Sequence, residues 1–280
     1  MIEIEIFKYT FFQHALLAGL CASILCGVVG TIVVAKQMSA ISGGIAHASF
    51  GGIGLGYFLG IDPFITATAF SLGLAGIAAI LLRTIKERMD TLIAAFWAGG
   101  MALGIVFISR TSGYVPDLFS YLFGNILMVS REQVLAMALL TLITVIITAL
   151  CYQELVSVIV DEEFSEVMGI PVSVYICLFL VLIALTVVML ISVVGIILVI
   201  ALLTLPPAGV QWHCKSLRSM MISASCVGIG CTFLGIMCSF FFDLPTGAMI
   251  ILICIAWYAL SRVFCYLRGD LKKGNGFANT

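Results

Sequence analysis

The sequence predicts an all-α protein, a polytopic transmembrane helical bundle of about eight or nine spans that include half-helices. Of its 280 residues, 62% are hydrophobic and only 10% are charged, and the mean hydropathy is +1.24. Soluble domains contain about 25% charged residues, so a soluble globule, a disordered chain and a coiled coil are excluded. Membrane lipid is therefore the expected surrounding. The net charge of −1 argues against a nucleic-acid partner, because that partner requires a basic surface.

The first half of the chain contains four apolar runs of span length. Phe11–Ala35 has about 25 residues, which is too long for the apolar part of a cleavable signal and long enough to cross a bilayer. Gly43–Gly60 and Phe64–Leu82 are separated by an Asp-Pro pair, which is typical of a turn. Thr91–Ser109 follows a charged stretch and completes this half.

The second half contains further full-length runs and two short ones. The full-length runs are Glu132–Cys151, Val172–Ser192, Leu217–Phe241 and Thr246–Phe264. Val193–Pro206 is too short to cross unaided and ends at two prolines, and Leu118–Val129 is shorter still. Short apolar segments indicate half-helices or re-entrant pieces enclosed by protein. No soluble domain fits between the runs, so residues 1–280 are expected to form a single transmembrane domain.

The placement of Lys and Arg predicts that the N-terminus is outside the cell and the C-terminus inside. In that orientation, ten Lys and Arg residues are on the inner side and three on the outer side. The inner ones are Lys36, Arg83, Lys86, Arg88, Lys215, Arg218, Arg262, Arg268, Lys272 and Lys273, and the outer ones are Lys8, Arg110 and Arg131. This topology requires an odd number of crossings.

The inner segment Asp161–Pro171 is predicted to form a short amphipathic helix. Three acidic residues begin it, which suits the positive end of the helix dipole, and Gly169 and Pro171 are stop signals. The segment is either an ordinary capped loop helix or a docking element for a cytoplasmic partner. In the second case, the docking residues are Asp161, Glu162, Glu163, Phe164, Glu166, Met168 and Gly169.

Small residues recur every four positions in the second span. They are Gly44, Ala48, Gly52, Gly56 and Gly60. This spacing places them in one stripe along a helix, where a neighbouring backbone can approach closely. We therefore expect the stripe to be a helix-packing surface.

His47 lies in the row next to that stripe, inside the apolar region. An ionisable residue within a span usually faces a cavity or the bundle interior, and neutral imidazole is a common ligand of transition metals. His47 is either a metal ligand on a transport path or a buried histidine bonded to a backbone carbonyl or a serine. Asp62 and Asp243, near prolines on the predicted outer face, are weaker metal candidates because Asp commonly makes turns there.

Motifs of enzymes do not occur in this sequence. There is no GxxxxGK[ST] phosphate-binding loop, no GxSxG, no HExxH and no paired Cys/His zinc motif. The ten cysteines form no CxxC pair and are expected to be small packing residues. We therefore predict neither an enzyme nor a bound prosthetic group.

Three stretches carry a family resemblance in combination. They are VAKQMSAISGGIAHASFGGIGLGYFLGIDP (Val34–Pro63), LFGNIL (Leu122–Leu127) followed by Asp161–Pro171, and VVGIILVIALLTLPPAGV (Val193–Val210) followed by Phe241–Leu252. In this order and spacing they resemble the permease subunit of ATP-binding-cassette (ABC) importers for zinc, manganese or iron ions. The resemblance covers essentially the whole chain.

The family implies an all-helical permease of the cytoplasmic membrane that forms a homodimer. It works with a cytoplasmic ABC ATPase and an extracytoplasmic metal-binding protein, and it moves a divalent metal ion that is cargo rather than a cofactor. Family members often have Asp four residues before the histidine, where this chain has Gly43. His47 therefore carries over as the candidate ligand without the carboxylate, and Asp161–Pro171 carries over as the ATPase-docking segment.

Other functions are open alternatives. A permease for another ABC substrate, such as an iron chelate, would have similar features. A secondary ion transporter would usually carry acidic residues within its spans and internal repeats, and the sequence displays neither.

Overall fold

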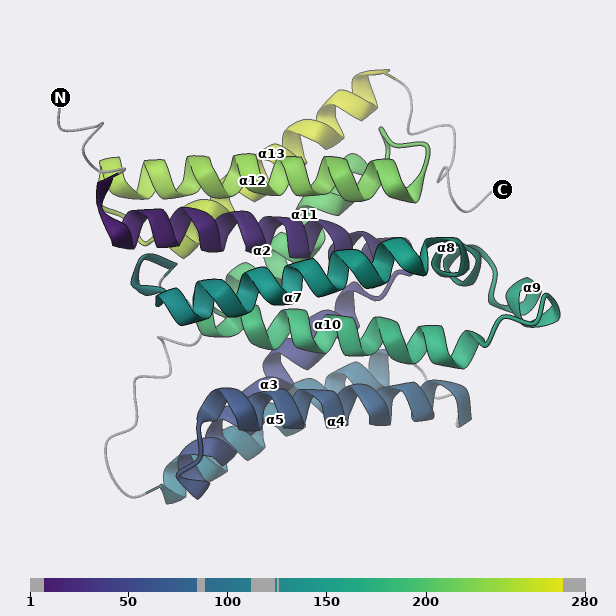
Figure 1. Ribbon diagram of the computed structural model, residues 1–280, viewed down its shortest axis with the longest axis horizontal. Helices are drawn as coiled ribbons and strands as arrows, with labels where there is room; N and C mark the ends of the chain where they lie inside the picture. The colour runs from purple at the N-terminus through teal and green to yellow at the C-terminus, as the bar shows by residue number, and fades with distance from the viewer. Residues whose placement is uncertain (1–7, 85–88, 112–123, 125, 269–280) are drawn as a thin grey trace.

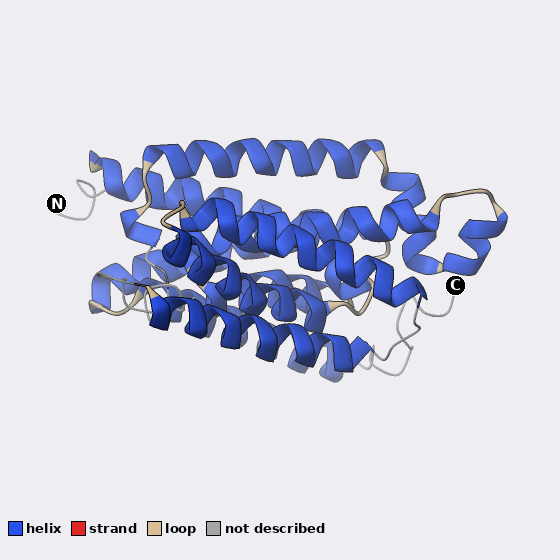
Figure 2. Ribbon diagram, turned by 90° about the horizontal axis from the view of Figure 1, so that it is seen from below, coloured by secondary structure: helices blue, strands red, loops and turns tan. Residues whose placement is uncertain are grey.

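The computed structural model describes residues 8–84, 89–111, 124 and 126–268. Within these ranges every regular element is a helix, as Figure 2 shows. The elements are α2 (Thr10–Ala35), α3 (Ser39–Leu59), α4 (Pro63–Thr84), α5 (Met89–Arg110), η2 (Ile126–Met128), α7 (Arg131–Leu150), α8 (Tyr152–Val160), α9 (Glu162–Val167), α10 (Val172–Val194), α11 (Ile196–Val210), α12 (Leu217–Phe242) and α13 (Thr246–Arg268). The expected all-α fold is confirmed.

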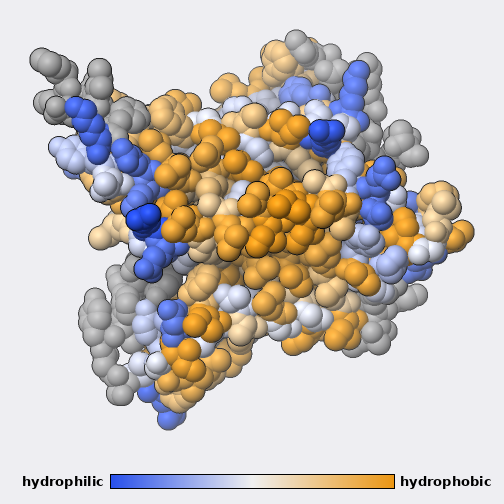
Figure 3. All heavy atoms as spheres, in the orientation of Figure 1, coloured by the Kyte–Doolittle hydropathy of each residue, from blue (hydrophilic) through white to orange (hydrophobic). Residues whose placement is uncertain are grey.

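Seven of the described helices are long and apolar enough to cross a membrane. They are α2, α4, α5, α7, α10, α12 and α13, and their described bounds follow the apolar runs of the sequence. The helix α3 has span length, and α11 is a shorter apolar helix of 15 residues. Figure 3 shows apolar side chains over the middle of the molecule and hydrophilic ones towards its two ends. The chain is therefore a multi-pass membrane protein.

The helices form two groups joined by α10. One group is α3, α4 and α5, in which α3 packs on both of its neighbours. The other group is centred on α2, which packs against α7, α11 and α12. The buried helix α10 contacts α4 and α3 on one side and α2 on the other. Figure 1 shows α2 beginning and α13 ending at opposite ends of the bundle, which fits an odd number of crossings.

The half-helix predicted at Val193–Pro206 exists with different bounds. Helix α10 ends at Gly195, whose φ of 81° and ψ of 161° suit only glycine, and α11 begins at Ile196. The expected stop at the prolines is wrong, because α11 continues through Pro206 and Pro207 to Val210. The other short run, Leu118–Val129, lies largely outside the described residues, apart from Gly124 and a 3-10 turn, η2, near its end.

A glycine of α2 lies against α11 beside its prolines. Pro207 has no N–H, so it cannot bond the carbonyl of Leu203 one turn earlier. That carbonyl lies against Gly30, where an added Cβ would sit 2.2 Å from the Leu203 oxygen. Glycine at this position therefore lets α2 approach the proline-containing part of α11 backbone to backbone.

Candidate functional site

His47 lies on α3 and faces α5. Its imidazole stacks on the indole of Trp97, with ring centroids 4.1 Å apart and ring planes inclined by 9°. The side chain is half-buried. Its Nδ1 atom is buried and has no hydrogen-bond partner among the described residues. The carbonyl or serine partner expected of a structural histidine is therefore missing at this nitrogen.

Gly43 leaves an open space one turn before His47. A Cβ added there would have no neighbour nearer than the Ile200 Cδ1 atom, at 4.0 Å. A Cβ atom at the position where the family resemblance places a carboxylate would therefore meet no clash.

Four residues of the small-residue stripe pack α3 against its own neighbours in the chain. A Cβ at Gly52 would lie 2.6 Å from the Ala67 Cα of α4, and one at Gly56 would lie 2.7 Å from the Pro63 Cα. On the α5 side, Gly44 contacts Ile93, and Ala48 lies against Gly100, where an added Cβ would be 2.3 Å from the Ala48 Cα.

The fifth residue of the stripe does not pack. Gly60 follows the last residue of α3 and has a φ of 68°, the left-handed conformation that ends many helices. Nothing lies within 4 Å of an added Cβ. The predicted packing role of Gly60 is wrong, because the four-residue spacing continues beyond the point at which the helix ends.

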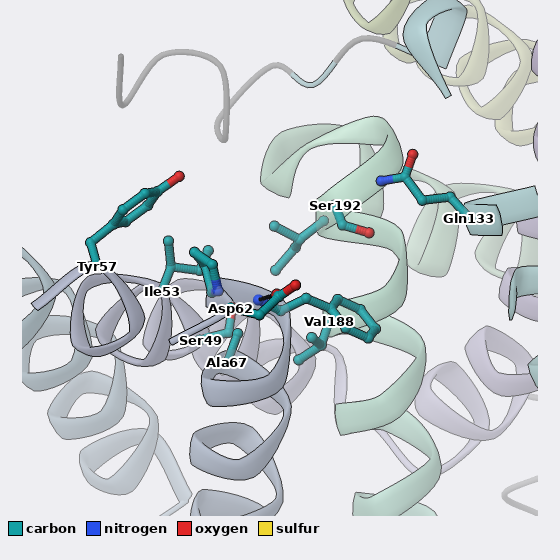
Figure 4. Close-up of a pocket in the computed structure, with 11 residues that line it drawn as sticks. Ser49, Ile53, Tyr57, Asp62, Ala67, Gln133, Val188 and Ser192 are labelled. Atoms are coloured by element: carbon teal, nitrogen blue, oxygen red, sulfur yellow. Dashed lines mark hydrogen bonds between the residues drawn. The ribbon is translucent and has the colours of Figure 1, made fainter. Parts of the chain in front are cut away.

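Asp62 begins α4 and lines a cavity of about 230 Å³. Its Oδ1 accepts a hydrogen bond of 2.7 Å from the Phe64 backbone N–H, which is the role of a helix cap. Figure 4 shows Tyr57, Gln133 and Ser192 around the same cavity. The cavity lies between α3, the start of α4, the start of α7 and the end of α10.

Asp243 does not line the cavity of Asp62 but lies at the end of α12. It ends α12 with a φ of 53°, and it lines a second cavity of about 370 Å³ beside the start of α13. His47 lines neither of these cavities. Within the described part of the chain, no three His, Cys, Asp or Glu side chains converge as a metal site. The fold therefore does not bring His47, Asp62 and Asp243 together in one metal site.

The expected amphipathic helix after the α7–α8 pair is present as α9. Asp161 caps it, because its Oδ1 accepts a 2.9 Å bond from the Phe164 N–H. Gly169, with a φ of 82°, lies just beyond its end. Phe164 is 59% exposed and Met168 is 65% exposed. Figure 1 shows α9 projecting beyond the end of the bundle.

Lys36 ties this projection to the start of α3. Its Nζ donates a 2.8 Å hydrogen bond to the carbonyl of Val158 in α8 and forms an ion pair with Glu162 of α9. The lysine is in the short connection between α2 and α3. One side chain thus joins the start of α3 to the projecting helices α8 and α9.

Comparison with known proteins identifies the family. The model of the ABC 3 transport family matches residues 8–265. The chain belongs to the ABC 3 transport family. It is therefore a membrane-spanning ABC transport protein, a permease, and the resemblance seen in the sequence is confirmed.

Relatives of the permease have similar length and fold. It is 37% identical over 252 residues to a protein of Chlamydia pneumoniae named "probable metal transport system membrane protein", covering 88% of this chain and 86% of that one. It is 30% identical over 269 residues to the manganese transport system membrane protein MntC of Halalkalibacterium halodurans, covering 96% and 92%. The solved structure of PsaBC from Streptococcus pneumoniae in complex with Fab matches with a TM-score of 0.83 and 30% identity, covering 93% and 95%.

Trp97 is the functional candidate that sequence reasoning missed. It lies fifty residues after His47 on another span, and no motif connects the two. An aromatic residue followed closely by Gly99 and Gly100 is the available signal, but that pattern does not identify its partner.

Proposed function

We propose that this permease carries a divalent transition metal ion into the cell, with Mn²⁺ as the first ion to test and Zn²⁺ and Fe²⁺ as alternatives. The observation that carries the proposal is the unpartnered imidazole of His47 on a membrane helix of a family permease. The names of the two relatives, a metal and a manganese transport protein, support it. Imidazole suits several transition metals, so the residue alone does not choose among them.

His47 would act as a transient ligand. A single imidazole without the family carboxylate binds an ion weakly, and a transport path needs sites that also release their ion. We infer that two copies of the permease enclose the path, so that two His47 side chains come near each other. The exposed Trp97 and the α5 surface around it are where we expect the second copy.

Energy would come from a separate cytoplasmic ATPase, because the sequence has no phosphate-binding loop of its own. We expect the ATPase to bind the exposed residues of α9 and an extracytoplasmic metal-binding protein to deliver the ion to the opposite end. Asp62 and Asp243 remain weak candidates for contact with the arriving ion.

The metal content of cells with and without this permease tests the function directly. Each ion is supplied separately, and uptake is repeated in liposomes that contain the permease and its ATPase. We expect ATP-dependent accumulation of at least one of the three ions. Accumulation driven by a proton or sodium gradient without ATP would support a secondary transporter instead, and uptake of a metal chelate alone would support the other ABC alternative.

Replacing Phe164 with glutamate should detach the ATPase. An exposed aromatic side chain on a capped helix is typical of the anchors that dominate protein interfaces, where truncation costs about 2 kcal/mol or more. We expect co-purification of the two subunits to be lost while the permease stays monodisperse. Val174→Glu, at an equally exposed apolar position at the start of α10, is the matched control. Wild-type recovery of the ATPase with Phe164→Glu would refute the docking role.

The predicted orientation can be tested by cysteine labelling. In a background with the ten native cysteines replaced, an impermeant thiol reagent added outside cells should label Leu244→Cys, in the α12–α13 turn. It should not label Lys215→Cys, before α12, until the cells are opened. Both positions are exposed. The reverse pattern would show that the N-terminus is inside.

A further inference from the structure

Among the residues that the structure describes, none forms a hydrogen bond with the buried Nδ1 of His47 that would fix the orientation of the ring. Histidines that ligate metals almost always donate their second ring N–H to a carboxylate, a carbonyl or water, and that bond sets the ring plane and the tautomer. In this permease Nδ1 is buried without a partner among the described residues. The acidic residue of the family motif is also missing, because Gly43 stands in its place. Another contact must therefore hold the imidazole.

That contact is the indole of Trp97. The two rings lie 4.1 Å apart and nearly parallel, so the indole is in direct contact with a face of the imidazole. Trp97 covers one face of the imidazole, while 44% of its own surface stays exposed. A large apolar side chain is thus placed at the open side of α3 and α5, next to the proposed ligand.

The surrounding backbone contacts fix the register of the pair. Gly44 contacts Ile93 before the stacked rings, and Ala48 lies against Gly100 after them. Trp97 is four residues after Ile93 and three before Gly100, so it is on the same face of α5 as both contacts. Because α3 and α5 meet backbone to backbone here, neither ring can shift along its helix without opening the interface.

We propose that Trp97 is a positioning residue that holds the imidazole of His47 so that Nε2 faces the transported ion. This inference rests on the proposed function of His47. Because Nδ1 is buried, we assign the other ring nitrogen, Nε2, to the ion. The stack replaces the orienting hydrogen bond, and it also keeps water from one face of the ring. Trp97 does not touch the ion and acts through His47.

The first test compares Trp97→Leu with Trp97→Phe in liposomes that hold the permease and its ATPase, with Mn²⁺ as the transported probe. Loss of an orienting contact at a metal ligand typically lowers affinity about 10–100-fold. We therefore expect Trp97→Leu to raise the KM for Mn²⁺ about tenfold, with little change in the maximal rate. Trp97→Phe retains a stacking ring and should therefore have a KM close to that of the wild type. The matched control, Phe96→Leu, removes the neighbouring half-buried aromatic residue of α5 and should leave the KM unchanged.

A spectroscopic test uses the native Trp97. The chain has three tryptophans, so Trp212→Phe with Trp257→Phe leaves Trp97 as the only emitter. Co²⁺, which quenches nearby indoles, should quench this emission at saturation, and the quenching should be lost when His47→Ala is added. Quenching that is the same with and without His47 would overturn the proposal.

The outcomes separate this proposal from the proposed function. Wild-type uptake by His47→Ala would refute the ligand role and, with it, the role of Trp97. Loss of uptake by His47→Ala together with a normal KM for Trp97→Leu would overturn only the positioning role. Equal defects in Trp97→Leu and Trp97→Phe would overturn it as well, since a stacking ring would then not be what matters. Rescue by phenylalanine together with His47-dependent quenching supports it.

Discussion

Metal uptake is expected to fall to background when His47 is replaced by alanine, while the permease still folds and binds its ATPase. His47 is the one histidine on α3, and its half-buried side chain stacks on Trp97. Removing the proposed ligand leaves no imidazole on this helix to replace the hydration shell of the ion. The measurement is ATP-dependent uptake of Mn²⁺, Zn²⁺ and Fe²⁺, each tested separately, in liposomes with the ATPase.

Two further variants give this prediction its controls. His14→Ala removes a half-buried histidine near the start of α2 and should leave uptake unchanged. Gly43→Asp places a carboxylate where the fold has space, and it should tighten binding and shift the choice of ion, since a carboxylate adds charge and hardness. Normal uptake of all three ions by His47→Ala would show that His47 only packs, and the path would then be sought at Asp62, Asp243 or the α11 backbone.

Replacing Gly56 with leucine should leave little folded permease. A Cβ at this position would lie 2.7 Å from the Pro63 Cα and 2.4 Å from the Thr66 Oγ1, so the new side chain meets backbone that cannot rotate away. Overpacking a core commonly costs about 1–3 kcal/mol, and a clash with backbone belongs at the upper end of that range. The measurement is the yield of monodisperse protein in detergent and its Tm.

The same substitution at Gly73 is the matched control. Gly73 lies on α4, exposed, and nothing is within 4 Å of an added Cβ. Gly73→Leu should therefore fold with wild-type yield and gain slightly from the higher helix propensity of leucine. Similar yields for the two variants would show that α3 does not depend on close approach to α4 at Gly56.

The sequence predicted the helices well because their boundaries depend on local signals. Charges and turn residues bound each apolar run, and the cap at Asp161 is a local pattern with a known geometry. Gly60 shows where this reasoning fails. A repeat of small residues predicts a packing surface, but it does not say whether the helix is still continuing at the last of them.

Long-range contacts account for the rest of what the sequence missed. His47 was identified because an ionisable residue in an apolar run is unusual. Its contact with Trp97 depends on Gly100 and Gly104 letting α5 reach α3, which no pattern within either helix reveals. The close approach of α2 to α11 beside the prolines likewise requires Gly30, which is far away in the sequence.

The bonds of Lys36 connect the projecting helices α8 and α9 to the start of α3 over a short distance in the chain. Lys36 is attached to both α8 and α9, and α3 begins at Ser39, only three residues later. If the ATPase binds α9 as proposed, a push on α9 would reach the start of the helix that carries His47 without passing through α10. Because backbone contacts hold α3 against α4 and α5, a force on the start of α3 would move the three helices together. The same helix, α3, would thus receive the force at its first residues and hold the ion at His47, two turns later.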